Sequence, residues 1–214
     1  MVVHMTKVKI CGLKSLTDVE IVNKYLPEYV GFVFADTKRF VSDELASKMK
    51  QALDKRIQSV GVFVNEPQEH IISLYEQGII DLVQLHGDES MEYIHELKKK
   101  INVPIIKAVR VQNAEQVREE LQQEADFMLF DTYKKGTYGG SGERFSLVIL
   151  EESLMEEENK RSYFLAGGLT PDNIKEVLGS VDCYCVDVST GVETDGSKDE
   201  EKVREFIERV RGVK

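Results

Sequence analysis

Eight short apolar runs, each separated from the next by a longer amphipathic stretch, constrain the fold of this chain more than any other feature. Several runs are continuously apolar, which is typical of strands covered on both faces of a parallel sheet. The predicted strands are residues 7–11, 29–34, 59–64, 82–85, 104–109, 127–131, 163–166 and 183–188. Helices are expected to start between them, at Ser15, Ser42, Pro67, Asp88-Glu89 and Thr170-Pro171-Asp172.

This alternation predicts an α/β fold and, more narrowly, a (β/α)8 (TIM) barrel. Eight units in 214 residues average about 27 residues each, which is compact for such a barrel but within its range of about 200 to over 400 residues. Open doubly wound sheets more often have five or six strands. No linker or shift of composition interrupts the series, so we expect one domain over residues 1–214. The acidic run 151–158 is interpreted as a solvated helical face.

Charge and cysteine content exclude several classes of function. The chain has 28 Lys+Arg and 38 Asp+Glu, so its net charge is 28 − 38 = −10, which disfavours nucleic acid as a partner. No stretch approaches the ~20 apolar residues of a membrane span, and the first residues do not resemble a signal peptide. We therefore expect a cytoplasmic protein without a membrane partner. Three cysteines without Cys-x-x-Cys spacing argue against disulfides, a zinc knuckle or a redox pair.

In a barrel of this kind, function is expected at the C-terminal ends of the strands, where the βα loops lie. Polar residues follow almost every predicted strand. Two segments suit phosphate binding through backbone N–H groups, namely 166–169 after the seventh strand and 188–193 after the eighth. The alternative for each segment alone is an ordinary glycine turn. The presence of both segments, after the seventh and the eighth strand, favours phosphate binding. A long glycine-rich loop at 132–143 is either a substrate-covering loop or a plain surface loop.

Two side chains at this rim are candidates for acid–base chemistry. Cys11 ends the first predicted strand, and its thiol reference pKa of ~8.5 would need only modest lowering by nearby cations or helix N-termini for the thiol to act as a base. Lys9, Arg39 and Lys107 are the candidate cations, and the sequence does not place them. Asp131 emerges from an apolar run, where desolvation is expected to raise its pKa and suit it to a general acid. An N-cap or loop-organising role is the alternative for Asp131, and a buried structural thiol is the alternative for Cys11.

Arg39 is a candidate for carboxylate recognition or for a surface ion pair. Cys183 and Cys185 are interpreted as structural residues that alternate within the last strand and point to the same face.

Eight segments, in this order along nearly the whole chain, resemble the phosphoribosylanthranilate isomerase family of tryptophan biosynthesis. The segments are Lys9-Ile10-Cys11-Gly12-Leu13, Gly31-Phe32-Val33-Phe34 with Lys38-Arg39-Phe40-Val41, Gly61-Val62-Phe63-Val64-Asn65, Gln84-Leu85-His86-Gly87-Asp88-Glu89, Asp131, Gly139-Gly140-Ser141-Gly142, Ala166-Gly167-Gly168-Leu169 and Asp187-Val188-Ser189-Thr190-Gly191-Val192-Glu193. The glycine motifs are weak individually. The Cys-Gly-Leu start, the Gln-Leu-His-Gly segment and the Ser-Thr-Gly-Val-Glu end together are specific.

The resemblance implies an Amadori rearrangement of N-(5-phosphoribosyl)anthranilate to 1-(2-carboxyphenylamino)-1-deoxyribulose 5-phosphate. It implies Asp131 as general acid, Cys11 as general base and Arg39 as the ligand of the anthranilate carboxylate. The loops at Gly168 and at Ser189, Thr190 and Gly191 would hold the phosphate. It further implies a small-molecule phosphoribosyl substrate, no cofactor, no metal, and a monomer or homodimer.

Two rival hypotheses remain from the sequence. The related ribonucleotide isomerase of histidine biosynthesis performs the same rearrangement, but with an aspartate where this chain has Cys11. A non-catalytic barrel that binds a phosphorylated metabolite or a protein is the other, because a fold alone does not establish function. The presence of both Cys11 and Asp131 argues against this second alternative.

Overall fold

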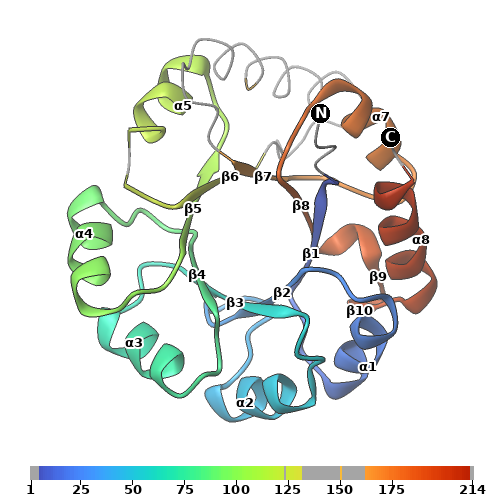
Figure 1. Ribbon diagram of the computed structural model, residues 1–214, viewed down its shortest axis with the longest axis horizontal. Coiled ribbons are helices and arrows are strands. Elements are labelled where there is room, and N and C mark those ends of the chain that lie inside the picture. Colours follow the sequence, from blue (N-terminus) through green and yellow to red (C-terminus); the bar gives the residue numbers. More distant parts are fainter. Residues whose placement is uncertain (1–4, 123, 132–149, 151–161, 213–214) are drawn as a thin grey trace.

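Eight parallel strands close into a barrel in the computed structural model, which describes residues 5–122, 124–131, 150 and 162–212 (Figure 1). Strands pair in sequence order, and β1 pairs with β8 to complete the ring. The strands are β1 (Lys7–Cys11), β2 (Tyr29–Val33), β3 (Gln58–Phe63), β4 (Leu82–Leu85), β5 (Ile105–Arg110), β6 (Phe127–Asp131), β7 (Tyr163–Ala166) and β8 (Cys185–Val188). The predicted (β/α)8 barrel is therefore confirmed, and the predicted strand ends differ by at most two residues.

Helices form the outer ring of the barrel (Figure 1). Those in the described residues are α1 (Leu16–Tyr25), α2 (Asp43–Ala52), α3 (Gln68–Glu76), α4 (Met91–Lys100), α5 (Ala114–Glu120), α7 (Ile174–Ser180) and α8 (Glu200–Arg211). Ser15 and Ser42 cap α1 and α2 by accepting a backbone N–H, and Pro67 precedes α3, as the sequence predicts.

Two predicted helix starts are displaced toward the C-terminus. Helix α4 begins after Ser90 rather than at Asp88-Glu89, because the Glu89 carboxylate is buried and accepts backbone N–H groups of the preceding loops. Helix α7 begins at Ile174. Thr170 and Asn173 precede it in a reciprocal turn, in which each side chain accepts the backbone N–H of the other residue.

The apolar residues separate into a layer inside the barrel and a layer between strands and helices. Alternate residues of each strand face the interior, where Phe164 and Leu129 pack with Cys185. Cys183 precedes β8 and packs in the outer layer instead. The expectation that Cys183 and Cys185 lie in one strand and share a face is therefore wrong.

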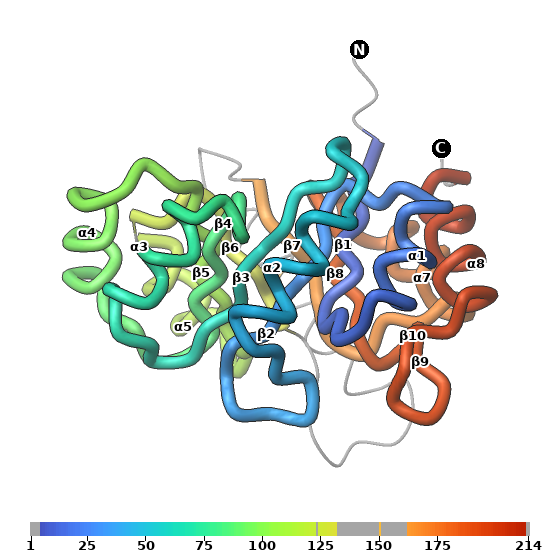
Figure 2. Tube along the Cα trace, turned by 90° about the horizontal axis from the view of Figure 1, so that it is seen from below, coloured from blue at the N-terminus to red at the C-terminus, as the bar shows by residue number. Residues whose placement is uncertain are grey.

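Two described segments of the chain project at one end of the barrel (Figure 2). The segment after β2 projects there, together with the hairpin of β9 (Glu193–Thr194) and β10 (Ser197–Lys198), which follows the short 3-10 helix η1 (Thr190–Val192). The predicted loop 132–143 and acidic run 151–158 lie outside the described residues. Within the described ranges, no helix combines the length and apolar character that crossing a membrane requires.

Candidate active site

A layer of buried polar side chains lies inside the barrel beneath the C-terminal rim. Lys9 in β1 is 0% exposed, and its Nζ donates to Gln84 Oε1 at 2.6 Å and to Asp187 Oδ2 at 2.8 Å. Burial lowers the pKa of Lys9, but the Asp187 carboxylate outweighs this and raises the pKa above its ordinary value. Lys9 therefore carries a positive charge in the middle of the barrel.

Cys11 lies two residues beyond Lys9 on the same inward face and is buried. Gly31, its register partner in β2, leaves space for the thiol, because a Cβ at this position would lie 2.6 Å from Cys11 Sγ. Burial raises the pKa of the Cys11 thiol, and the ammonium groups of Lys9 and Lys198 offset this only in part. The thiol pKa is therefore raised on balance, and Lys9, one of the three candidate cations, lies beside Cys11 and acts to lower it.

Asp131 is the last residue of β6 and shares the inward face with Leu129, two residues before it. Its backbone pairs with Arg110 of β5 and Ala166 of β7. Strands β7 and β8 separate Asp131 from Cys11 around the ring. The structure thus places the predicted acid and base at the C-terminal ends of two strands of the same barrel.

Arg39 reaches across to the segment that follows β8. Its Nε and Nη2 donate to the two carboxylate oxygens of Glu193 at 3.0 and 3.1 Å, and Nη2 also lies 3.4 Å from Thr190 Oγ1. Gly12 allows this approach, because a Cβ there would lie 2.4 Å from Arg39 Cδ. In the described part of the chain Nη1 has no hydrogen-bond partner, so one edge of the guanidinium remains open to an incoming carboxylate.

Glu193 is shared between two cations. Lys198 Nζ donates to its Oε1 at 2.8 Å and to the Ser189 carbonyl at 3.1 Å, with both charged side chains less than a tenth exposed. These bonds fix the segment after β8 against the loop that carries Arg39.

The loops after β7 and β8 meet, as the predicted phosphate site requires. Gly168 has φ 63°, a left-handed conformation that favours glycine. Gly191 packs so closely on the other loop that a Cβ would lie 1.9 Å from the Leu169 carbonyl oxygen. Ser189 Oγ donates to the Cys11 carbonyl at 3.0 Å, which joins this segment to the strand of the candidate base.

The loop after β4 is held by a third buried ion pair, outside the barrel interior. Lys107 faces the same layer as its neighbours Ile105 and Val109, and its Nζ donates to Glu89 Oε2 at 2.8 Å and to the Gly87 carbonyl at 2.6 Å. Lys107, one of the candidate cations for Cys11, is therefore directed to the outer layer and away from the thiol.

The sequence analysis assigns no role in the site to Gln84, Glu89, Asp187 or Glu193, which occur in it only within motifs or a helix start, and it does not name Lys198. The signal for most of them was present, because a charged or amide residue inside a run such as Leu-Val-Gln-Leu or Cys-Val-Asp-Val must find a buried partner. What the sequence does not show is which partner each one meets.

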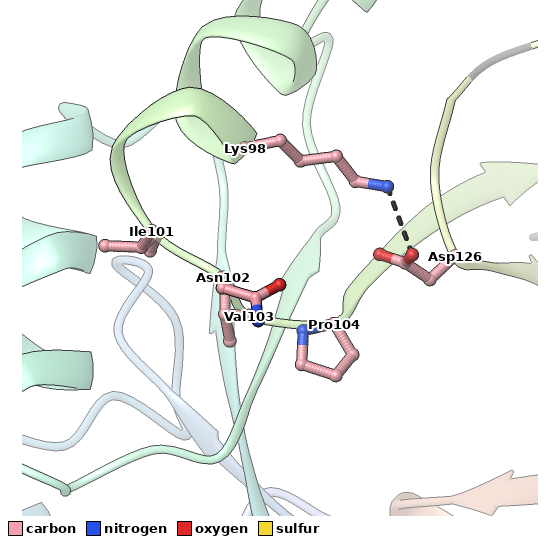
Figure 3. A pocket seen from close by; sticks show the side chains of 6 residues that line it. All are labelled: Lys98, Ile101, Asn102, Val103, Pro104 and Asp126. Atoms are coloured by element: carbon pink, nitrogen blue, oxygen red, sulfur yellow. Dashed lines mark hydrogen bonds and ion pairs between the residues drawn. The ribbon is translucent and has the colours of Figure 1, made fainter.

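A pocket of about 370 Å³ lies away from this rim (Figure 3). It is lined by residues that precede β5 and β6 and therefore opens at the N-terminal end of these strands, where Lys98 pairs with Asp126. Its lining residues are Lys98, Ile101, Asn102, Val103, Pro104 and Asp126. None of these residues belongs to the candidate active site.

The fold and the rim define a (β/α)8-barrel enzyme with a candidate acid and base at the ends of two strands. A family model described as N-(5'-phosphoribosyl)anthranilate (PRA) isomerase matches residues 8–209. An N-(5'-phosphoribosyl)anthranilate isomerase of Lachnoclostridium phytofermentans is 51% identical over 208 residues, which cover 94% of this chain and 95% of the relative. The chain belongs to the PRA isomerase family.

Solved structures of this family have the same fold. The phosphoribosyl anthranilate isomerase of Thermotoga maritima superposes with a TM-score of 0.85 at 36% identity, covering 97% of this chain and 100% of that chain. A second PRA isomerase structure, at 32% identity and TM-score 0.81 with 97% and 100% coverage, is a complex with reduced 1-(o-carboxyphenylamino)-1-deoxyribulose 5-phosphate.

The contact between Gly31 and the thiol generates a prediction. In Gly31→Ala the new methyl group displaces Cys11 Sγ, and we expect kcat/KM to fall by about tenfold or more, since misplacement of about 1 Å costs up to ~100-fold. Gly179→Ala is the matched control, because a Cβ at Gly179 meets nothing within 4 Å. Parental kcat/KM in Gly31→Ala, measured on folded protein, would contradict this account of the thiol.

Glu193 generates a second prediction, on acid stability. Burial raises the pKa of Glu193, but Arg39 and Lys198 outweigh this effect and bring the pKa to about 2, below the ordinary value of 4.5. The unfolded chain therefore takes up this proton first, so the stabilisation is complete above about pH 4.5 and is lost as the pH falls toward 2. In urea unfolding, Glu193→Gln should be less stable than the parent by about 2 kcal/mol at neutral pH. This difference should narrow on acidification, and a constant difference would contradict the assignment.

Proposed function

We propose that the protein isomerises N-(5-phosphoribosyl)anthranilate to 1-(2-carboxyphenylamino)-1-deoxyribulose 5-phosphate, a step of tryptophan biosynthesis, with Asp131 and Cys11 as acid and base. The observation that carries the proposal is the position of this carboxylate and this thiol on one rim of the barrel. Membership of the PRA isomerase family supports the substrate.

Asp131 acts first, as the general acid. It donates its proton to the furanose ring oxygen as the bond between this oxygen and C1′ breaks, and the nitrogen lone pair of the anthranilate forms the C1′=N⁺ iminium. The ring oxygen leaves as a hydroxyl group, so charge and protons balance. Its position at the C-terminal end of β6 suits this role, because the active sites of such barrels lie at this face.

Cys11 acts second, as the general base. The thiolate removes the C2′ proton, and the C2′–H electron pair forms the C1′=C2′ bond while the iminium is neutralised to an enolamine. Protonation at C1′ and loss of the 2′-hydroxyl proton then give the ketone. Lys9, buried beneath Cys11, favours the thiolate electrostatically, although burial keeps the thiol pKa raised in the free protein.

The remaining residues of the rim hold the two charged ends of the substrate. The open Nη1 edge of Arg39 is assigned to the anthranilate carboxylate, for which guanidinium geometry is well suited. The phosphate is assigned to the joined loops at Gly168 and at Ser189, Thr190 and Gly191, through backbone N–H groups. Glu193 neutralises part of the Arg39 charge and keeps the side chain in place before the substrate binds.

The direct test is steady-state turnover of freshly generated phosphoribosylanthranilate, followed by loss of its fluorescence. We expect rapid turnover by the parent and a loss of at least about 100-fold in Cys11→Ala and in Asp131→Asn, the scale of general acid–base catalysis. Cys183→Ala is the matched control, because this thiol lies in the outer layer of the fold. Because the pKa of Cys11 is raised, kcat/KM of the parent should still be rising with pH at neutrality.

Two outcomes would contradict the proposal. Parent turnover no faster than the blank, from folded protein, would favour another phosphosugar substrate or a binding function. Parental rates in both variants would remove the proposed acid and base.

A further inference from the structure

Gln84 lies between two groups whose chemistry determines which way its amide points. It is 1% exposed inside the barrel, with Oε1 at 2.6 Å from Lys9 Nζ and Nε2 at 2.9 Å from His86 Nδ1. An ammonium group has three donors and no acceptor, so only the amide oxygen of Gln84 can face Lys9. The amide NH2 must therefore face His86.

The orientation of Gln84 in turn determines where the proton of His86 lies. An amide NH2 only donates, so Nδ1 of His86 must accept and is unprotonated. In a neutral imidazole the proton is then on Nε2. Burial lowers the pKa of His86, which keeps the ring neutral at neutral pH even though the Asp131 carboxylate opposes this shift.

Lys9 is fixed in this arrangement by Asp187, whose Oδ2 lies 2.8 Å from Nζ, and the ion pair is almost completely buried. The sequence of contacts from Asp187 through Lys9 and Gln84 to His86 thus runs across the barrel interior from β8 and β1 to β4. The direction of each hydrogen bond in this series follows from the positive charge of Lys9, which only donates.

His86 occupies the position directly after β4, at the same rim as Cys11 and Asp131. Its backbone N–H donates to the Phe63 carbonyl at 2.8 Å, and the Glu89–Lys107 pair holds the residues that follow. Among the described residues, Nε2 of His86 has no hydrogen-bond partner.

We propose that Gln84 is a positioning residue, which holds His86 as the neutral Nε2–H tautomer so that the imidazole donates a hydrogen bond to a substrate oxygen at the rim. The donation to substrate rests on the proposed function. The tautomer itself does not, because it follows from contacts within the protein.

A purely structural role for Gln84, as a filler that satisfies Lys9, is the competing explanation. Gln84→Glu separates the two roles. The new carboxylate still accepts from Lys9 and has nearly the same shape, but it cannot donate to His86. His86 must then place a proton on Nδ1, and its neutral form loses the Nε2–H donor.

The first measurement is the histidine tautomer state, read from long-range ¹H–¹⁵N correlation spectra of the full-length protein without substrate. The chain has four histidines, so the His86 signals are assigned by their loss in His86→Asn. We expect an Nε2–H ring in the parent and protonated Nδ1 in Gln84→Glu. A parent ring protonated on Nδ1, or a mixture of tautomers, would overturn the proposal even if Gln84→Glu does not fold.

The second measurement is the pH dependence of kcat/KM. In Gln84→Glu we expect a loss of about 10- to 100-fold at alkaline pH, where the ring is neutral, as for other residues that orient a site ligand. The loss should shrink at lower pH, where protonation restores the Nε2–H donor. Gln84→Met, which neither accepts nor donates strongly, should show a pH-independent loss.

Gln58→Glu is the matched control, because it makes the same charge change at an exposed position in β3. If the tautomer of His86 is inverted in Gln84→Glu as expected but the pH profile of kcat/KM is unchanged, the proposed hydrogen bond from His86 Nε2–H to the substrate is wrong. Absence of turnover in the parent would count against the proposed function and leave the tautomer result standing.

Discussion

The ion pair between Lys9 and Asp187 is the interaction on which the rest of the site depends. The two residues are register partners in β1 and β8, the first and last strands, so the pair lies at the seam where the barrel closes. Burying two charges is costly unless each is compensated. Lys9 gains Gln84 as a further acceptor, whereas Oδ1 of Asp187 is buried without a hydrogen-bond partner among the described residues. The next inward positions along the same strands are Cys11 and Ser189. The pair therefore lies directly beneath the candidate base Cys11 and beneath Ser189, where the candidate phosphate-binding loop starts.

The two-residue period of the strands distributes the chemistry over the two faces of the barrel wall. Inward positions stack the site in order, with Cys11 beyond Lys9, His86 beyond Gln84 and Asp131 beyond Leu129. Lys107, in an outward position, stabilises a loop instead, because its ion pair with Glu89 holds the segment after β4. The rim thus combines side chains positioned by rigid strands with loops that are themselves held by buried ions, an arrangement that preorganises a site before substrate arrives.

The barrel was predictable from sequence because each apolar run and each helix cap is a local signal, as the correct starts at Ser15 and Ser42 show. The positions of Cys11 and Asp131 at strand ends follow from the same signals. Partners could not be predicted, because they depend on packing between distant segments. Burial raises the pKa of Cys11 despite the ammonium groups of Lys9 and Lys198, and Arg39 meets Glu193, which is 154 residues away in sequence. The start of α4 shifted for a similar reason, since Glu89 is engaged by a lysine of the next strand.

A double-mutant cycle on Lys9 and Asp187 tests the central claim most directly, with unfolding free energy and kcat/KM measured for each variant. Lys9→Met or Asp187→Leu alone leaves an unpaired buried charge and should cost about 3 kcal/mol or more. The double variant should be destabilised by much less than the sum, since two apolar side chains replace two charges. Its kcat/KM should nevertheless stay at least about 100-fold below the parent, because neither Cys11 nor Gln84 retains the ammonium beside it. Parental activity in the double variant would show that the pair serves only stability and would contradict the account.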